Sequence, residues 1–345
     1  MREAHDVGLA GYTTLRVGGP ARRLLTAETE GEIIAAVERC AEAHEPLFVL
    51  GGGSNVVISD AGFDGTVLHI ASRGIRAADQ TFCSRHPVFT SLLVAAGEPW
   101  DDFVAFCVDR GYVGLEALSG IPGTVGATVV QNVGAYGADV SGAVARVRTY
   151  DRDTRQVRTF AGADCAFAYR TSMFKQTPDR YVVLDVEFEL RIGTQSAPIM
   201  YAELARALDV EVGSSAPVAD VREAVLALRR SKGMVLDAGD HDTWSAGSFF
   251  LNPVVAADLV PDGAAAWPQP DGRVKVSAAW LVDHAGIGKG FTMGGAGTST
   301  KHALAIINRG DATAADVFAL AAHIQSAVHD RFGIDLVPEP VYLGA

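Results

Sequence analysis

The feature that most constrains this chain is a run of three glycines after a short apolar segment. Residues 46–50, PLFVL, predict a buried strand, and Gly51, Gly52 and Gly53 follow it directly. Residues without a Cβ let the backbone turn with positive φ and let a ligand approach closely. Ser54 and Asn55 then place a hydroxyl and an amide beside exposed N–H groups, as a phosphate requires. The spacing fits neither a Walker loop nor a Rossmann fingerprint, so this loop alone is equally compatible with a tight turn between strands.

A second glycine-rich loop covers residues 120–127, GIPGTVGA. Its Pro-Gly pair is typical of a turn, and its small residues leave room for another body against the backbone. Two such loops in one domain can hold both phosphates of a dinucleotide through backbone N–H groups. Gln131 and Asn132 follow, and their amides can bind the edge of a flavin ring or satisfy the loop's own backbone. We expect cofactor contacts from Gly51, Gly52, Gly53, Ser54, Asn55, Gly123, Thr124, Ala127, Gln131 and Asn132.

Composition excludes several classes of protein. A chain of 345 residues suits two or three compact domains, and its net charge of −12 argues against general binding to nucleic acid or membrane surfaces. An anionic ligand therefore needs a locally basic pocket. The cysteines, Cys40, Cys83, Cys107 and Cys165, form no C-x-x-C pair, so we expect neither a zinc site nor a disulfide framework.

No targeting or metal-binding signal stands out. Residues 1–20 lack an apolar signal core, and no apolar run has membrane-spanning length, so we expect a cytoplasmic protein that does not bind membranes. Asp240-His241-Asp242 is the one cluster that resembles a metal site, and it is more typical of a solvated loop. We therefore predict no bound metal.

Hydrophobic periodicity predicts an α+β protein. Tyr12–Pro20 is expected to form a short strand that enters a Gly-Gly-Pro turn, and Asp311 to cap a long C-terminal helix. A change in composition near 191–198 indicates a domain boundary. We predict one domain over 1–195, with lobes of about 1–75 and 76–195, and a second over 196–345 whose last strand returns toward the first. Strands are predicted at 21–26, 47–50, 65–70, 92–97, 144–151, 156–160, 181–190, 274–276 and 303–308, and other helices at 29–44, 100–110, 201–208, 217–231 and 278–285.

Three later motifs carry groups that could perform chemistry. Arg170 lies in Tyr-Arg-x-Ser-x-Phe-Lys, from 169 to 175, and Ser248 lies in Ala-Gly-Ser-Phe-Phe-x-Asn-Pro, from 246 to 253. Glu339 stands between two prolines, whose rings restrict the conformations around it. By themselves these residues could be a surface arginine, a turn serine and a charged residue at a strand edge.

With these motifs and the two glycine loops, the chain resembles the UDP-N-acetylenolpyruvoylglucosamine reductases, within the FAD-binding superfamily that includes vanillyl-alcohol oxidase. The resemblance runs from about Tyr12 to Tyr342. It implies a two-lobed FAD-binding module and a C-terminal α+β domain that binds substrate. The family usually has Asn-Thr where this chain has Thr13-Thr14, which leaves open which side chain there holds the flavin.

The resemblance also implies a reaction and roles for its residues. NADPH reduces FAD, and the flavin then reduces the enolpyruvyl ether of UDP-N-acetylglucosamine to UDP-N-acetylmuramate for peptidoglycan synthesis. Arg170 matches the arginine that binds the substrate carboxylate, Ser248 the general acid, and Glu339 the carboxyl that hydrogen-bonds the enol intermediate. Since residues 51–55 contain no His or Cys, we expect the FAD to be bound non-covalently at that loop.

Four further residues are candidates for substrate binding. Tyr201 is similar to the tyrosine that closes over the UDP-sugar in the longer-looped subclass of the family. Lys232, Asn252 and Lys275 are candidates for contacts to the diphosphate, because a dianion needs cations in an acidic protein. Each of the four could equally be a surface residue.

Two other functions remain open at this point. The first is a flavin oxidase of a hydroxy acid, sugar or lactone, which would react rapidly with oxygen. The second is a non-catalytic protein that binds a nucleotide sugar, against which a copurified yellow cofactor would argue. We expect a monomer.

Overall fold

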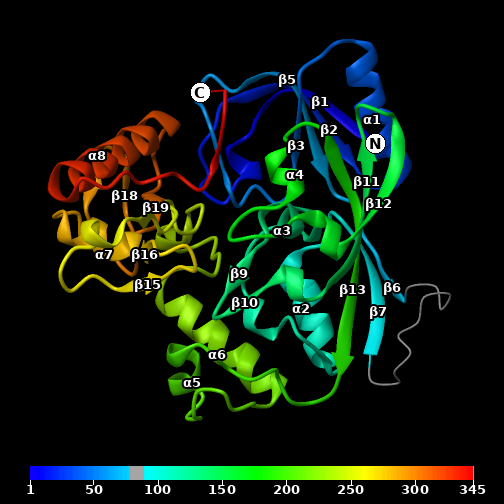
Figure 1. The fold of residues 1–345 in the computed structure, drawn as a ribbon. Helices are drawn as coiled ribbons and strands as arrows, with labels where there is room; N and C mark the ends of the chain where they lie inside the picture. The colour runs from blue at the N-terminus through cyan, green and yellow to red at the C-terminus, as the bar shows by residue number, and fades with distance from the viewer. Residues whose placement is uncertain (78–88, 345) are drawn as a thin grey trace. The chain divides into compact units, whose positions relative to one another are not determined.

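The computed structural model describes residues 1–77 and 89–344, so Cys83 lies outside the described residues. The chain forms two compact units and passes between them several times. Both units mix helices and strands, which confirms the predicted α+β class (Figure 1). The compact units divide the chain at other positions than the predicted domains do. Unit 1 comprises Met1–Val7, Arg22–Gly52 and Asp64–Arg230, and unit 2 comprises Gly8–Ala21, Gly53–Phe63 and Ser231–Ala345.

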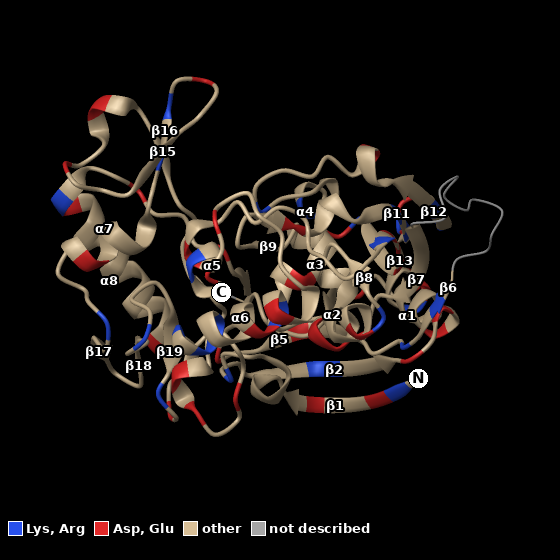
Figure 2. Cartoon of the chain, turned by 90° about the horizontal axis from the view of Figure 1, so that it is seen from below, with Lys and Arg blue, Asp and Glu red and all other residues tan. Residues whose placement is uncertain are grey.

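The first sheet of unit 1 has the strand order β1-β2-β5-β3. Strands β3 and β5 pair in parallel, and helix α1 connects β2 to β3 as predicted. Strand β1 lies at the edge of the sheet and carries charges of both signs, which discourage pairing with another chain (Figure 2). The elements are β1 (Arg2–Gly8), β2 (Pro20–Ala27), α1 (Glu30–Glu42), β3 (Leu47–Leu50) and β5 (Phe63–Ile70).

The second sheet of unit 1 is antiparallel and has the order β12-β11-β13-β7-β6, with β8 paired to β13. Helix α2 buries Trp100 and Phe103 against Phe188 of β13, with ring centroids of Phe103 and Phe188 4.9 Å apart. The strands are β6 (Ile75–Ala77), β7 (Phe89–Ala95), β8 (Tyr112–Val113), β11 (Val144–Asp151), β12 (Gln156–Ala161) and β13 (Tyr181–Ile192).

The remaining elements of unit 1 are mostly short. A small separate core beneath α5 and α6 contains Leu204, Val221 and Val225. A two-stranded ribbon, β9 and β10, follows helix α3. The elements are α2 (Trp100–Asp109), α3 (Val125–Gln131), β9 (Gly134–Ala135), β10 (Ala138–Asp139), α4 (Met173–Gln176), α5 (Ala202–Ala207) and α6 (Val218–Ser231).

Unit 2 has its own core, in which α7 and α8 pack with Phe249 and Phe250. The last strand, β20, pairs in parallel with β4, which follows the first glycine loop. The other strands form two sheets, in the orders β14-β16-β15 and β17-β18-β19. The elements are β4 (Val56–Ile58), β14 (Val254–Val255), β15 (Ala266–Pro268), β16 (Val274–Val276), α7 (Ala278–His284), β17 (Thr292–Met293), β18 (Ala296–Thr298), β19 (Ile306–Asn308), α8 (Ala314–Phe332) and β20 (Val341–Leu343).

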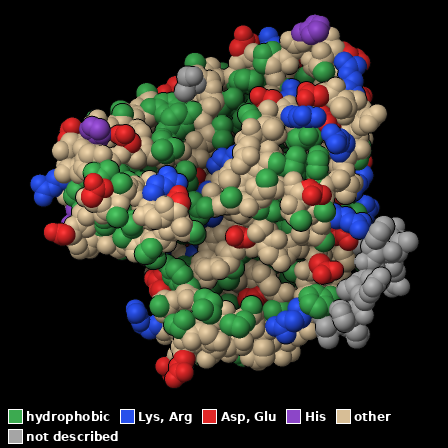
Figure 3. All heavy atoms as spheres, in the orientation of Figure 1, with side chains coloured by type: hydrophobic (Ala, Val, Ile, Leu, Met, Phe, Trp, Pro, Cys, Tyr) green, Lys and Arg blue, Asp and Glu red, His purple; other side chains and the backbone are tan. Residues whose placement is uncertain are grey.

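Two further features are the distribution of surface charge and the length of the apolar helices. Acidic and basic side chains are interspersed over the face shown in Figure 3. Across residues 1–77 and 89–344, none of the helices has both the length and the apolar character needed to span a bilayer.

Three predictions about local structure are wrong. No strand forms over residues 12–19, and β2 begins only at Pro20, because threonine hydroxyls in this stretch bond to nearby carbonyls, as Thr13 Oγ1 does to Ala10 O at 3.3 Å. The predicted strand at 303–308 is shortened to β19, because His302–Ala305 forms a turn in which Ala305 N donates to His302 O. Asp311 does not cap α8, since Thr313 occupies the N-cap position and forms a capping box with Asp316.

The capping geometry gives a paired prediction. Thr313→Ala removes the hydroxyl that accepts from Asp316 N, so it should lower the free energy of unfolding by about 1 kcal/mol. Asp311→Ala leaves the capping box intact and should change it by less than about 0.5 kcal/mol. Urea titrations of the two variants measure the difference. A larger loss for Asp311→Ala than for Thr313→Ala would contradict the assigned cap.

Candidate active site

In unit 1 the two glycine-rich loops lie against each other. A Cβ on Gly52 would stand 2.6 Å from Gly123 Cα, and one on Gly51 would stand 2.7 Å from Thr124 Oγ1 and 3.3 Å from Ala127 Cβ. Real Cβ atoms essentially never lie within 3.0 Å of a backbone atom, so Gly52 requires glycine, whereas a side chain at Gly51 would first have to displace the Thr124 side chain. The structure therefore brings together the parts of the two loops that the sequence predicts to hold a dinucleotide.

The second half of the first loop belongs to unit 2. Gly53 has φ of +62°, and a Cβ there would stand 1.9 Å from Tyr12 O. Asn55 Nδ2 donates to Glu339 O at 3.4 Å, and Asn55 O accepts from Val341 N at 3.0 Å. The loop is thus hydrogen-bonded directly to the C-terminal segment that carries Glu339.

The end of α3 presents the two amides predicted to meet the flavin ring. Asn132 adopts a left-handed conformation, with φ of 47°, and its Nδ2 donates to Ala168 O at 2.8 Å. Its Oδ1 is buried and has no hydrogen-bond partner within the described part of the chain. Gln131 Oε1 accepts from Lys175 Nζ at 2.7 Å. A buried acceptor at the end of the helix that begins in the second glycine loop fits the N–H groups of a flavin.

Arg170 is tied to this region by its own motif. Ser172 Oγ donates to Val130 O of α3 at 2.6 Å, and Lys175 Nζ donates to Arg170 O at 3.2 Å. Arg170 has φ of 56°, a strained conformation for a residue with a side chain, and its Nη2 donates to Gly134 O at 2.7 Å. The Arg170 guanidinium is therefore hydrogen-bonded to the backbone that follows α3.

In unit 2, the segments that carry Ser248 and Glu339 pair with each other. Glu339 N donates to Phe249 O at 2.9 Å, and Leu251 N donates to Val337 O at 3.0 Å. Phe249 N also donates to Leu304 O at 2.8 Å. Since the Phe249 side chain is fully buried, the backbone beside Ser248 is held by both hydrogen bonds and packing.

Sequence reasoning missed His302, which the turn at 302–305 places beside Ser248. Its Nε2 lies 3.5 Å from Ser248 Oγ. Burial, together with the charges of Lys232 and Lys289, lowers the pKa of His302 to about 4, so the imidazole is neutral at pH 7. The nine histidines show no pattern in the sequence, and the contact follows from the fold, in which Phe249 N donates to Leu304 O.

Sequence reasoning also did not single out Arg229. It lies on α6 in unit 1, where burial lowers its pKa to about 10; the charge of Asp101 opposes that shift and the charge of Arg170 adds to it. In the sequence it appears as an ordinary basic residue in the last turn of a helix.

The predicted substrate-binding residues occupy both units. Tyr201, in unit 1, is 44% exposed, and its ring meets that of Tyr136 edge-on at 5.5 Å. Lys232, in unit 2, contributes to the field on His302. Asn252 Oδ1 accepts from Ala278 N at 2.9 Å and so holds the start of α7. Lys275 Nζ lies 5.9 Å from the centroid of the exposed Trp267 ring.

Comparison with known proteins identifies the class first. Residues 21–160 match the family model "FAD binding domain". This range includes both glycine-rich loops. The chain is therefore a flavoprotein with a site that holds FAD. Residues 239–343 match the model "UDP-N-acetylenolpyruvoylglucosamine reductase, C-terminal domain", which includes Ser248, His302 and Glu339.

Full-length relatives then identify the family. The chain is 54% identical to the UDP-N-acetylenolpyruvoylglucosamine reductase of Cutibacterium acnes, over 98% of this chain and 90% of the relative. It is 52% identical to that of Streptomyces coelicolor, over 100% and 91%. The crystal structure of the Thermus caldophilus reductase aligns with a TM-score of 0.67 at 26% identity, over 99% of this chain and 98% of that chain. The chain belongs to the UDP-N-acetylenolpyruvoylglucosamine reductase family and is an FAD-dependent oxidoreductase.

The close contact of the glycine loops predicts the effect of a single methyl group. Gly52→Ala should sharply lower the amount of FAD bound per protein, because the new Cβ must displace the backbone of Gly123. Gly31→Ala is the control. Gly31 lies in helix α1, where alanine is favoured, and a Cβ there meets nothing within 4 Å. Flavin absorbance relative to protein measures occupancy after purification. Equal occupancy in the two variants would contradict a cofactor site at these loops.

Proposed function

We propose that this protein uses NADPH to reduce the enolpyruvyl ether of UDP-N-acetylglucosamine to UDP-N-acetylmuramate, a step in peptidoglycan precursor synthesis. The observation that carries the proposal is the backbone pairing of Phe249 with Glu339, since it holds the segments that carry Ser248 and Glu339 side by side. The names of the relatives support the same substrate. A cytoplasmic location and a monomeric state stay predictions.

The reaction makes clear physical demands on the protein. When bound, FAD supplies a hydride, taken from NADPH, to the terminal alkene carbon of the substrate. Negative charge then builds at the neighbouring carbon and spreads into the carboxylate of the enolpyruvyl group. The protein must stabilise that charge and deliver a proton to the same carbon.

We assign the first task to Arg170 and Glu339. A guanidinium stays charged at every physiological pH and binds a carboxylate through a planar pair of donors. The Arg170 backbone strain and its hydrogen bond to Gly134 support a fixed orientation for that fork. The Glu339 carboxyl is proposed to hydrogen-bond the enol intermediate as charge develops.

We assign the proton transfer to Ser248. Its hydroxyl gives its proton to the carbanionic carbon, which is a stronger base than the alkoxide left behind. The buried Phe249 beside it supports a dry and fixed setting for the hydroxyl. Lys232, Asn252 and Lys275 are proposed to bind the diphosphate, and Tyr201 to close over the UDP-sugar.

Separate half-reactions test this assignment. In Ser248→Ala, NADPH should still bleach the flavin at the wild-type rate, because that step needs no proton from Ser248. Reoxidation by the enolpyruvyl substrate should slow by about 100-fold or more. Stopped-flow absorbance under anaerobic conditions measures both steps.

The control is Ser326→Ala, which removes an exposed hydroxyl from α8 and should leave both half-reactions unchanged. Equal loss of both half-reactions in Ser248→Ala would contradict the role of Ser248. Reoxidation by oxygen alone, with no response to the enolpyruvyl substrate, would instead support the flavin oxidase.

A further inference from the structure

A histidine faces the proposed proton donor, and the reaction scheme above gives it no task. His302 Nε2 lies 3.5 Å from Ser248 Oγ. The hydrogen bond from Phe249 N to Leu304 O, 2.8 Å long, keeps the two segments in register. Catalytic hydrogen bonds are often long without substrate and shorten in the productive complex, so this distance suits an interacting pair.

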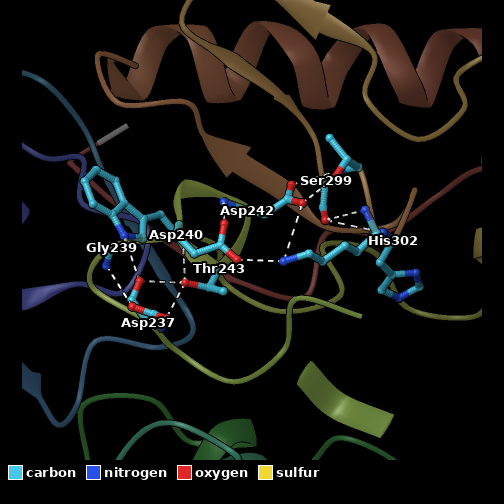
Figure 4. Close-up of polar contacts among 10 residues, drawn as sticks. Asp237, Gly239, Asp240, Asp242, Thr243, Ser299 and His302 are labelled. Carbon is cyan, nitrogen blue, oxygen red and sulfur yellow. Dashed lines mark hydrogen bonds and ion pairs between the residues drawn. The ribbon is translucent and has the colours of Figure 1, made fainter. Parts of the chain in front are cut away.

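The turn that carries His302 is held in place from several sides (Figure 4). Ser299 Oγ accepts from Lys301 N at 3.0 Å and from His302 N at 3.3 Å. Lys301 Nζ donates to Asp240 Oδ2 at 2.6 Å, and Asp242 Oδ1 accepts from Thr300 N at 2.8 Å. The turn that carries the imidazole is therefore held by its own hydrogen bonds and by a charged loop.

The surroundings of His302 determine whether it can donate a proton or only a hydrogen bond. The cations that act on it are Lys232 and Lys289, while Lys301 is paired with Asp240. Burial and those two cations hold the pKa of His302 near 4, so it is not a proton source at pH 7. A neutral imidazole still has one N–H, which can donate a hydrogen bond to an oxygen that gains negative charge.

We propose that His302 is a positioning residue for Ser248, whose Nε2–H donates a hydrogen bond to Oγ and stabilises the oxygen as its proton leaves. This inference rests on the proposed function. The tautomer with the proton on Nε2 leaves the Ser248 proton free to point at the substrate. The opposite tautomer would accept that proton and compete with the substrate carbon for it.

The proton transfer balances without any change in the protonation of His302. The Oγ–H bond of Ser248 breaks as a C–H bond forms with the electron pair of the enolate. The negative charge then resides on Oγ, where the Nε2–H hydrogen bond and the field of Lys232 and Lys289 stabilise it. Water supplies the proton that restores the hydroxyl. His302 keeps its proton throughout.

Two substitutions separate donation from titration. The amide nitrogen of Gln reaches about as far as Nε2 and donates without titrating, so His302→Gln should keep the rate of flavin reoxidation by substrate within about threefold. His302→Leu removes the donor and should slow that step by about 10-fold or more. Reduction of the flavin by NADPH should be unchanged in both variants. Anaerobic stopped-flow absorbance, from about pH 6 to pH 8, measures the two steps.

The profile against pH adds a measurement that a merely structural role would not affect. Between those pH values the reoxidation rates of wild type and His302→Gln should run parallel, because neither side chain titrates there. Equal slowing in both variants would overturn the inference, as would a wild-type rate in His302→Leu. Should the Leu variant fail to hold flavin, His302→Asn replaces it, since its shorter amide falls short of Oγ and should be slow.

The same experiment distinguishes this inference from the function on which it rests. Wild-type flavin that does not reoxidise with the enolpyruvyl substrate would refute the proposed function. Wild-type flavin that reoxidises as fast as that of His302→Leu would refute only the role of His302.

Discussion

The backbone hydrogen bonds of Phe249, one to Glu339 and one to Leu304, are the interaction on which the candidate site of unit 2 depends. Through them, three segments that are far apart in the sequence, and that carry Ser248, Glu339 and His302, are held side by side. The full burial of Phe249 excludes water from these bonds, which makes their loss costly. Ser248, Glu339 and His302 lie outside helices and regular strands, and the segment that contains Phe249 is hydrogen-bonded to the other two segments.

In unit 1, close contact between two loops brings the predicted cofactor-binding residues together. Its two glycine loops approach so closely that no side chain fits between Gly52 and Gly123, and the end of α3 extends that surface with a buried amide. The Arg170 motif is fastened to the same helix end through Ser172 and Lys175. Arg170, with its strained backbone, and Asn132, whose Oδ1 has no partner among residues 1–77 and 89–344, both break ordinary rules of stability, and such exceptions are expected at functional sites.

Much of the fold could be predicted from periodicity, and the candidate site only in part. Helix α1 and strand β3 follow directly from apolar patterns, because local burial determines them. Thr313 was missed because two polar residues compete for one cap, and backbone geometry chooses between them. His302 lies 54 residues from Ser248, so no local pattern links them. The roles given to Arg170, Ser248 and Glu339 came from family motifs, since bare physics also permits ordinary surface residues.

The central claim is that one flavin carries electrons from NADPH to an enolpyruvyl group in this protein. An anaerobic two-step absorbance experiment on the purified wild-type protein tests it most directly. NADPH is added until the flavin is bleached, and UDP-N-acetylglucosamine-enolpyruvate is then added in the absence of oxygen. Our account predicts that the oxidised spectrum returns in proportion to the substrate added. A flavin that stays bleached until air is admitted would contradict it.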